Sequence, residues 1–412
     1  MIRLKINERD GYMVDSDLPH NCIFNKARTG CGATTIAIRN NENYVIAVPT
    51  TELIINKCNS ERELFGLYGN FTASLKNRLK EYIKTAKQIK IMCTYDKLPK
   101  LLEYINANDC RLLVDEYHNL LKQYSFRDKA IDGVLDNFKA FKSFCFMSAT
   151  PIDTELKPNV LDGVTEYVAD WKEPLQLYIL PYQTNKPYQF AANVISKYKQ
   201  QGYLEVNGHK SEEAYFFLNS VQEIAHIIKQ CGLTNDNCRV ICANTSHNQK
   251  KLDEMKISDS VSPARMFNFI TCKSFEGADF FSETGLCFVI SNVYKKQTLA
   301  SIDIDIPQIA GRIRNRENPL RHTVIHIFNT KKDDMFASYE EVKKETFRQL
   351  EIAEERVKAY NSFSTDAKKQ QAKEVKDSLY IRYNNGMFEV NDRAVNYILY
   401  EYKLMHQIYQ SK

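Results

Sequence analysis

The chain has 412 residues, of which 43% are hydrophobic and 26% are charged, and its formal net charge is +5. A length of roughly 100–200 residues per domain predicts two or three domains, and the composition excludes a disordered or fibrous protein. No apolar run approaches the ~20 residues that a membrane-spanning helix needs, and the N-terminus lacks a signal peptide's apolar core, so we expect a cytoplasmic protein without a membrane partner.

The 11 cysteines include no C-x-x-C pair, which argues against a zinc knuckle or a disulfide framework. Cys238, Cys242 and His247 are close enough in sequence to suggest a metal site. They flank an apolar, strand-like run, however, so we interpret the two cysteines as buried thiols.

The first ~150 residues alternate short β-rich runs with helical ones, the pattern of a parallel sheet with crossover helices. The predicted strands are residues 22–24, 43–49, 88–93, 110–116 and 143–150. Ligands of such sheets bind at the carboxyl ends of the strands, where polar residues follow most of these runs.

Residues 75–90 carry six basic residues and one Glu, with apolar residues at helical spacing. The pattern predicts an amphipathic helix with a cationic outer face. Two interpretations have similar weight: a solvated surface helix, or a helix that contacts a phosphate backbone.

A second alternating block follows, with predicted strands at residues 175–182, 214–219, 237–244, 267–272, 285–292 and 322–329. The fold class is therefore α/β. We expect a first domain over 1–155, a linker over 156–174, a second domain over 175–332 and a charged helical extension over 333–412.

The stretch NKARTGCGATT, residues 25–35, follows the first predicted strand and is similar to the phosphate-binding loop G-x-x-x-x-G-K-[ST]. Gly30 and Gly32 allow backbone conformations that other residues disfavour, and Thr34 stands at the Ser/Thr position of the motif. Ala33 stands where the loop's lysine belongs. By itself, such a stretch is often only a glycine turn between a strand and a helix.

Two further motifs end buried strands. In LLVDEYH, Asp115 and Glu116 lie at a carboxyl end, where one carboxylate can hold Mg²⁺ through water and the other can orient an attacking water. Paired acids in such a place are uncommon, because burying charge is costly. In FMSATP, Ser148 and Thr150 end the next strand.

The ordered set TGCGATT, VPTTEL, DEYH and SAT resembles the first motor domain of superfamily 2 helicases of the DExH type. In the second block, FITCKSFEGADFF is similar to the family motif with Thr271, Gly277 and Asp279. QIAGRIRNR is similar to its Q-x-x-G-R-x-x-R motif, with Gln308, Gly311 and Arg312. The resemblance covers roughly residues 20–330.

The resemblance implies two tandem RecA-like domains with ATP and Mg²⁺ in the cleft between them and a nucleic-acid strand across both. Thr34 and Asp115 would bind the metal, and Glu116 would act on the attacking water. Arg312 would contact the γ-phosphate. Ser148 and Thr150 would couple hydrolysis to domain movement. The residues that would bind ATP are Thr29, Gly30, Cys31, Gly32, Ala33, Thr34, Thr35, Gly277, Asp279 and Gln308.

Two departures from the family pattern concern cations. The last arginine of Q-x-x-G-R-x-x-R falls on Asn315, and of its neighbours Arg314 and Arg316 we favour Arg316 as the replacement. For the loop lysine, we favour relocation to Lys26, four residues before Gly30, an arrangement similar to that of phage terminase motors.

Three alternatives to the relocated lysine stay open. Arg28, inside the loop, is a weaker candidate for the same role, and Lys26 is otherwise an ordinary surface lysine. A loop that binds ATP without hydrolysing it would leave the retained Asp115, Glu116 and Arg312 unexplained.

Thr50, Thr51, Thr94 and Thr271 are candidate contacts to the nucleic-acid backbone, although hydroxyls after a strand are equally typical of helix caps. We expect an ATP-dependent helicase or translocase that acts on DNA rather than RNA. The alternatives are a non-hydrolysing clamp and a terminase motor, but a terminase would carry a nuclease in place of the second ATP-type block.

A phage or mobile-element replication helicase that resembles the origin-binding group fits the compact size and the charged tail. That group implies bacterial or phage-infected host cytoplasm, and a replication protein that binds the C-terminal helices.

Overall fold

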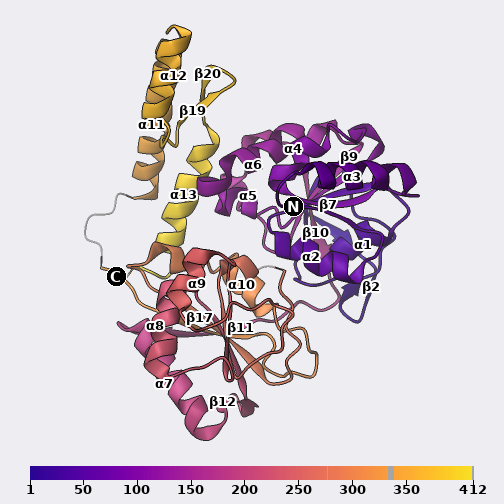
Figure 1. The fold of residues 1–412 in the computed structure, drawn as a ribbon. Helices are drawn as coiled ribbons and strands as arrows, with labels where there is room; N and C mark the ends of the chain where they lie inside the picture. The colour runs from indigo at the N-terminus through magenta and orange to yellow at the C-terminus, as the bar shows by residue number, and fades with distance from the viewer. Residues whose placement is uncertain (276, 333–337, 411–412) are drawn as a thin grey trace.

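The computed structural model describes residues 1–275, 277–332 and 338–410. Two parallel sheets, each flanked by helices, form two domains side by side, and a C-terminal unit lies against both of them (Figure 1). The predicted α/β class and the two tandem RecA-like domains are confirmed. Within the described residues, no helix is both long enough and apolar enough to cross a membrane.

The first sheet has eight strands in the order β1-β10-β4-β9-β8-β5-β7-β6. They are β1 (Ile2–Lys5), β4 (Cys22–Asn25), β5 (Tyr44–Val48), β6 (Phe65–Leu67), β7 (Lys90–Thr94), β8 (Arg111–Asp115), β9 (Ser143–Ser148) and β10 (Thr165–Asp170). All five predicted strands are present, because each is a short run of side chains that both faces of the sheet bury.

Strand β10 lies inside residues 156–174, which the sequence indicated as a linker. It pairs in parallel with β1 and with β4, so the first domain extends at least to Asp170 and the expected boundary is wrong. The strand was missed because most of its side chains are exposed or half-buried, and it therefore lacks an apolar run.

Helices α1 (Ala33–Arg39) and α2 (Thr51–Ser60) pack in one hydrophobic core of the first domain. Helices α3 (Ala73–Thr85), α4 (Leu98–Leu101), α5 (Asn119–Lys122) and α6 (Tyr124–Asn137) contribute to a second one. A small hairpin of β2 (Glu8–Arg9) and β3 (Tyr12–Met13) precedes β4.

The basic helix is shorter than expected. It ends at Thr85, and Lys90 is instead the first residue of β7, only 3% exposed. Lys90 Nζ donates hydrogen bonds to Ala37 O at 2.7 Å and to Asn40 Oδ1 at 2.6 Å. This lysine therefore belongs to the interior rather than to a cationic surface.

The second sheet has six parallel strands in the order β11-β18-β17-β14-β16-β15. They are β11 (Tyr178–Gln183), β14 (Glu213–Phe217), β15 (Cys238–Ile241), β16 (Phe267–Ile270), β17 (Gly285–Ser291) and β18 (Thr323–Phe328), which confirms all six predictions. The other elements are α7 (Pro187–Gln201), the hairpin β12 (Leu204–Val206) and β13 (His209–Ser211), α8 (Val221–Cys231), α9 (Ser246–Leu252) and α10 (Asp305–Ala310). Cys238 and Cys242 are buried and His247 is exposed.

The C-terminal unit consists of α11 (Tyr339–Asn361), α12 (Thr365–Glu374), β19 (Ile381–Asn384), β20 (Met387–Val390) and α13 (Arg393–His406). The expected charged helical extension contains three helices, and it also contains β19 and β20, which form an antiparallel hairpin that was not expected. Asn385 and Gly386 form its turn at φ 48° and 83°, and Asn-Gly is a strong hairpin signal that the sequence interpretation overlooked. Residues 333–337 and 411–412 of the expected extension lie outside the described residues.

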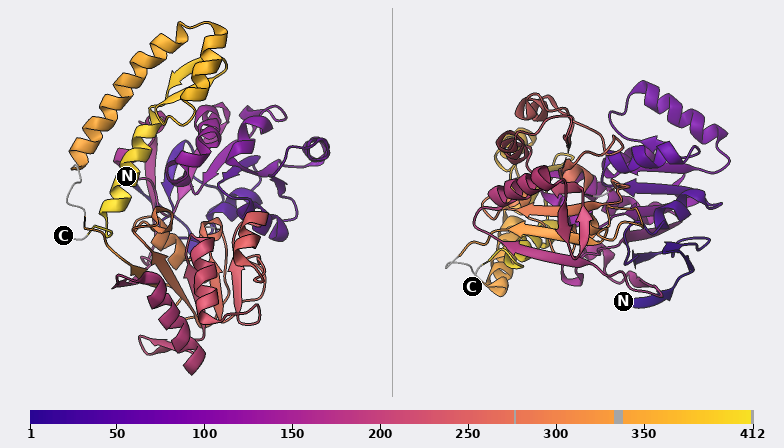
Figure 2. Two further views of the ribbon diagram at one scale, coloured as in Figure 1. Left: turned by 60° about the vertical axis from the view of Figure 1, so that its left-hand side comes forward. Right: turned by 90° about the horizontal axis from the view of Figure 1, so that it is seen from below.

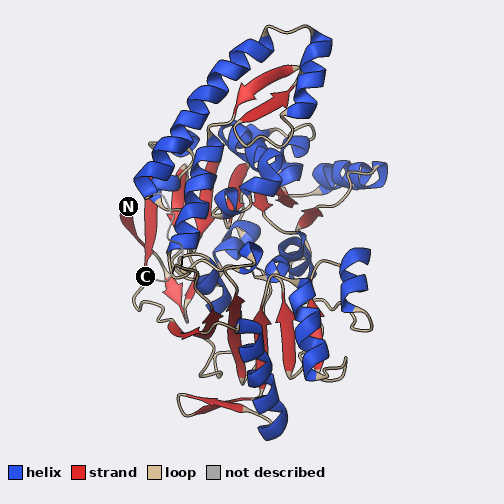
Figure 3. Cartoon of the chain, turned by 90° about the vertical axis from the view of Figure 1, so that its left-hand side faces the viewer, coloured by secondary structure: helices blue, strands red, loops and turns tan. Residues whose placement is uncertain are grey.

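Helix α13 connects the two domains. Lys403 Nζ lies 2.7 Å from Asp153 Oδ2 of the first domain. Beyond the helix, the hydroxyl of Tyr409 bonds Ala300 O at 2.7 Å and Ser291 Oγ at 3.0 Å in the second domain. Helices α11 and α12 and the β19–β20 hairpin project beyond both domains (Figure 2, Figure 3).

Candidate functional site

A cavity of about 280 Å³ lies at the carboxyl ends of the strands of the first sheet, and both domains line it. The first domain supplies Lys26, loop residues 30–35, part of α2 and the two acids at the end of β8, Asp115 and Glu116. The second domain supplies Gly277, Asp279, Phe281, Arg312 and Arg314. The topology therefore brings motifs from opposite ends of the sequence into one cleft.

The loop between β4 and α1 has the tight curvature that its glycines predicted. Gly30 and Gly32 have φ values of 63° and 83°, and Gly32 is the N-cap residue of α1. Ala27 also has a positive φ, 55°, although it is not a glycine. Asn25 Oδ1 accepts a hydrogen bond from Ala27 N at 2.8 Å, which stabilises this unfavourable backbone conformation.

Lys26 is 5% exposed, so its interpretation as an ordinary surface lysine is wrong. Its Nζ lies 2.8 Å from Glu116 Oε1 and 3.3 Å from Asp115 Oδ1. Burial by itself lowers the pKa of Lys26, but the two carboxylates outweigh it and hold the pKa above its ordinary value. The ammonium is therefore charged, and Trp171 Nε1 fixes its backbone by donating to Lys26 O at 2.8 Å.

The two acids face different partners. Asp115 Oδ2 accepts a hydrogen bond from Thr34 Oγ1 at 2.7 Å, which joins the strand end to the phosphate loop. Glu116 adopts φ 52°, an unusual conformation for a glutamate, and its Oε2 accepts from Gln308 Nε2 at 3.0 Å. The carboxylate of Glu116 thus contacts both domains, through Lys26 and through Gln308.

Ser148, the last residue of β9, and Thr150 lie next to Glu116. Ser148 Oγ is 2.8 Å from His118 Nδ1 and 3.3 Å from Glu116 Oε2. Gln308 Nε2 also donates to Thr150 Oγ1 at 3.1 Å, so one amide from the second domain bonds two residues of the first. A movement of the second domain would change both contacts.

The three arginines of QIAGRIRNR have different environments. Arg312 is 3% exposed, and its guanidinium donates to Gln308 O at 2.8 Å and to Ala278 O at 3.2 Å. Arg314 Nε donates to Asp279 Oδ1 at 2.6 Å, and its guanidinium lies against the phosphate loop. A Cβ on Gly30 would come within 1.8 Å of Arg314 Nη1.

Arg316, the replacement that the sequence favoured, lies elsewhere. Its guanidinium bonds Asp10 O and lies 5.1 Å from the centroid of the Tyr12 ring. Arg314 therefore faces the loop more directly than Arg316 does. The side chain of Thr29 also approaches Gly311 closely, because a Cβ on Gly311 would come within 1.8 Å of Thr29 Oγ1.

The donor atoms near the loop fit a hard divalent cation. The Thr34 hydroxyl and the Asp115 carboxylate lie 2.7 Å apart, and oxygens of these two kinds are the ligands that Mg²⁺ takes together with phosphate oxygens. No cluster of three or more His, Cys, Asp or Glu side chains suited to a metal occurs within the described residues. A metal would therefore depend on ligands from a bound phosphate.

Of the candidate nucleic-acid contacts, Thr50 is the N-cap of α2, and its side chain accepts a hydrogen bond from Leu53 N. Thr51 is the first residue of that helix and half-buried. Thr94 and Thr271 are 4% and 6% exposed, and Thr271 Oγ1 donates to Ile241 O at 3.3 Å. A cap is thus observed for Thr50.

Several cavity residues were missed by the sequence interpretation. Lys57 Nζ donates to Thr35 Oγ1 at 3.3 Å, and Asn56 Nδ2 donates to Gly277 O at 2.9 Å. Tyr12 and Phe281 also line the cavity, and Phe281 is 77% exposed. Phe281 is the last residue of the stretch FITCKSFEGADFF, but the other three lie outside the quoted motifs. Only the helical period of α2 hinted that Asn56 and Lys57 share the face of Leu53.

Comparisons with known proteins bear on the first domain and on the fold. Residues 17–157 match the family model of the DEAD/DEAH box helicase. No curated protein sequence matches the chain.

Among solved structures, Mss116p bound to ssRNA and AMP-PNP is 12% identical, with 84% of this chain and 80% of that chain covered and a TM-score of 0.50. The DUF1998 helicase MrfA bound to DNA and AMPPNP is 12% identical, with 90% and 57% covered and a TM-score of 0.49. S. cerevisiae Dbp5 bound to Gle1 and IP6 is 14% identical, with 75% and 78% covered and a TM-score of 0.46. The likeness to Mss116p concerns the fold of the two domains.

Proposed function

We propose that the protein is an ATP-dependent nucleic-acid helicase or translocase of superfamily 2, which hydrolyses ATP in the cavity between its two RecA-like domains. The observation that carries this proposal is the position of Lys26 Nζ, 2.8 Å from Glu116 and 3.3 Å from Asp115. A cation is thus present where the missing loop lysine would act, although its backbone lies at the opposite end of the loop.

Lys26 takes the place of the lysine absent at position 33. Lysine acts on phosphate as a point charge and does not need one fixed direction of approach, so a shifted origin is chemically acceptable. Incoming phosphate oxygens would compete with the two carboxylates for the ammonium. Binding would then release Glu116 from Lys26 and leave its carboxylate accessible to a water molecule.

Thr34 and Asp115 are the residues that would hold Mg²⁺. A bound Mg²⁺ supplies charge neutralisation on the phosphate oxygens. Glu116 orients and deprotonates the attacking water, and Gln308 fixes one oxygen of that carboxylate at 3.0 Å. Because Gln308 comes from the second domain, this alignment requires the domains to be together.

Arg314 supplies the second domain's cation to the phosphates, a role that the resemblance gave to Arg312. The contact of Arg314 with Gly30 supports this assignment, whereas Arg312 donates to the backbone carbonyls of Gln308 and Ala278. An arginine that completes the site only on closure raises the rate by about 10³-fold or more. Ser148 and Thr150 transmit the movement through Gln308.

A strand of nucleic acid would cross both domains near Thr50, Thr51, Thr94 and Thr271. The solved relatives Mss116p and MrfA are bound to ssRNA and to DNA respectively, which supports a nucleic-acid partner. DNA as the substrate, a role in phage or mobile-element replication and a partner on the C-terminal helices rest on the sequence resemblance.

ATP turnover by the purified chain, with and without single-stranded DNA or RNA, tests this function. We expect stimulation by a strand and loss of turnover in Glu116→Gln, which keeps the size of the side chain but removes the base. Glu354→Gln, on the exposed side of α11, is the matched control. Absence of turnover under every condition, with ATP binding retained, would instead favour a non-hydrolysing clamp.

A further inference from the structure

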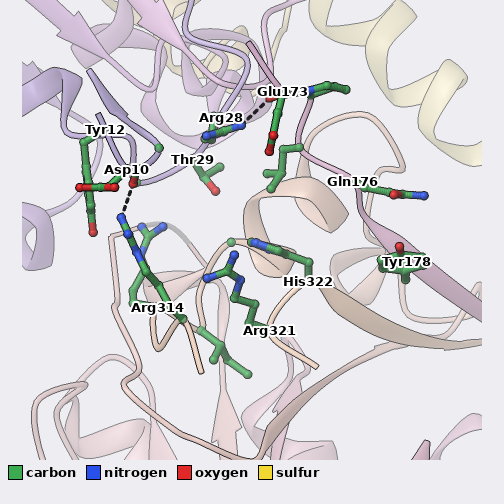
Figure 4. A pocket seen from close by; sticks show the side chains of 17 residues that line it. Asp10, Tyr12, Arg28, Thr29, Glu173, Gln176, Tyr178, Arg314, Arg321 and His322 are labelled. Atoms are coloured by element: carbon green, nitrogen blue, oxygen red, sulfur yellow. Dashed lines mark hydrogen bonds between the residues drawn. The ribbon is translucent and has the colours of Figure 1, made fainter. Parts of the chain in front are cut away.

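A second cavity, of about 560 Å³, adjoins the 280 Å³ cavity in which we propose that ATP binds, hereafter the nucleotide cavity (Figure 4). Loop residues 28–30 line it, whereas residues 30–35 line the nucleotide cavity, and the two cavities share Tyr12, Gly30 and Arg314. Its other walls are the β2–β3 turn, the connection to β11, and residues 311–322 of the second domain. Like the nucleotide cavity, it exists only where the two domains meet.

Cationic groups dominate this cavity. Arg28, Arg314, Arg316, Arg321 and His322 line it, against two acids, Asp10 and Glu173, that are both exposed to solvent. Figure 4 shows Arg321 and His322 on the side of the second domain, opposite Arg28 and Thr29.

Most of these arginines are held in place by neighbours. Arg28 lies over the Trp171 ring at 4.3 Å and donates to Glu173 O at 2.6 Å, and Arg314 and Arg316 are held by Asp279 and Asp10. Within the described residues, the guanidinium of Arg321 has no hydrogen bond or ion pair. Among the residues that the structure describes, Arg28 Nε and Thr29 Oγ1 are also buried without a hydrogen-bond partner.

The electrostatic effect of this arrangement is visible at His322. Burial lowers the pKa of His322, and the guanidinium of Arg321 lowers it further, followed by those of Arg28 and Arg314. The hydrogen bond to Ala310 O, 3.4 Å from Nδ1, acts in the opposite direction. Three guanidinium groups from two domains therefore act on one point in the cavity.

We propose that this second cavity binds inorganic phosphate at a site separate from the nucleotide. Gathering like charges around a half-buried space is unfavourable unless an anion neutralises them, and guanidinium groups match phosphate oxygens in geometry. Arg321 supplies the uncommitted donors, and the unpaired Arg28 Nε and Thr29 Oγ1 lie on the opposite wall. The charge and the unpaired donors carry this inference independently of the proposed ATPase, whose product would be the same anion.

Titration calorimetry of the full chain with inorganic phosphate, in saturating ADP, tests the proposal. ADP occupies the nucleotide cavity except for the γ-phosphate position, and the Arg321 variants distinguish that position from the second cavity, because Arg321 lines only the second cavity. We expect Arg321→Ala to weaken phosphate binding about tenfold or more, because a charge-assisted donor is lost, and Arg321→Lys to weaken it less. Arg348→Ala, which removes an exposed arginine on α11, is the matched control and should bind as the parent does.

A second readout uses His322 as a probe inside the cavity. An anion beside the imidazole stabilises its protonated form, so phosphate should raise the pKa of His322 in an NMR titration. The proposal is wrong if ADP abolishes phosphate binding, if Arg321→Ala binds phosphate like the parent, or if the His322 signal does not respond. Phosphate binding together with absent ATP turnover would overturn the proposed hydrolysis and leave this site intact.

Discussion

The ammonium of Lys26 lies 2.8 Å from the carboxylate of Glu116, although 90 residues separate the two in sequence. The contact places a buried cation beside the two acids that end β8. The proposed relocation of the loop lysine from position 33, where Ala33 stands, to Lys26 rests on this contact.

Lys26→Ala should abolish ATP turnover, because the phosphates lose their nearest cation. The variant should also lose about 3–5 kcal/mol of stability at neutral pH, since Asp115 and Glu116 are left as buried carboxylates without a counter-charge. Turnover assays and urea unfolding measure the two effects. Lys87→Ala, at an exposed position, is the matched control. Lys122 is unsuitable as a control, because it forms an ion pair with Asp305. Parent-level turnover would refute the relocated lysine.

Arg314→Ala should reduce kcat by about 10³-fold, while Arg316→Ala should have a much smaller effect. The reason is that Arg314 lies against Gly30, whereas Arg316 lies over Tyr12. Steady-state kinetics with separate kcat and KM distinguish a transition-state role from weaker ATP binding. Equal losses in the two variants would contradict the assignment.

Tyr409→Phe should destabilise the protein by about 1–3 kcal/mol, because it removes the buried hydroxyl that bonds both the carbonyl and the amide of Ala300. Thermal or urea unfolding measures the loss. Tyr294→Phe, at a tyrosine that is 70% exposed, should be neutral. If both variants unfold alike, Tyr409 does not stabilise the attachment of the C-terminal unit.

Lys90 provides a test of pH dependence. Burial lowers its pKa to about 8, below the ~10.4 expected in the unfolded chain. Between these values the unfolded state binds more protons, so the Lys90 contribution makes stability rise with pH. The parent should therefore gain stability relative to Lys90→Met from pH 8 to about 10.4. Urea unfolding across this pH range measures the difference in stability, and Lys87→Met, at an exposed position, is the control. If the stabilities of the parent and of Lys90→Met change in parallel with pH, the prediction is wrong.

The strands that the sequence predicted are those with a continuous apolar run, such as β5 and β17, because a strand buried on both faces cannot carry polar side chains cheaply. Strand β10 escaped detection since its side chains are half-exposed. The turn of the β19–β20 hairpin has the sequence Asn385-Gly386, which is typical of a β-hairpin, but the charged residues around it favoured a helix.

The sequence by itself determined the α/β class and the order of the motifs, and it pointed to candidate residues for a phosphate site, because these follow from local hydrophobicity and from residue types at fixed spacing. Only the tertiary structure decided which cation faces which anion. Lys26 reaches Glu116 because β4 and β8 both flank β9 in the sheet, and the contact between the two domains brings Arg314 rather than Arg316 to Gly30. Such relationships depend on sheet order and domain contact, which no local stretch of sequence encodes.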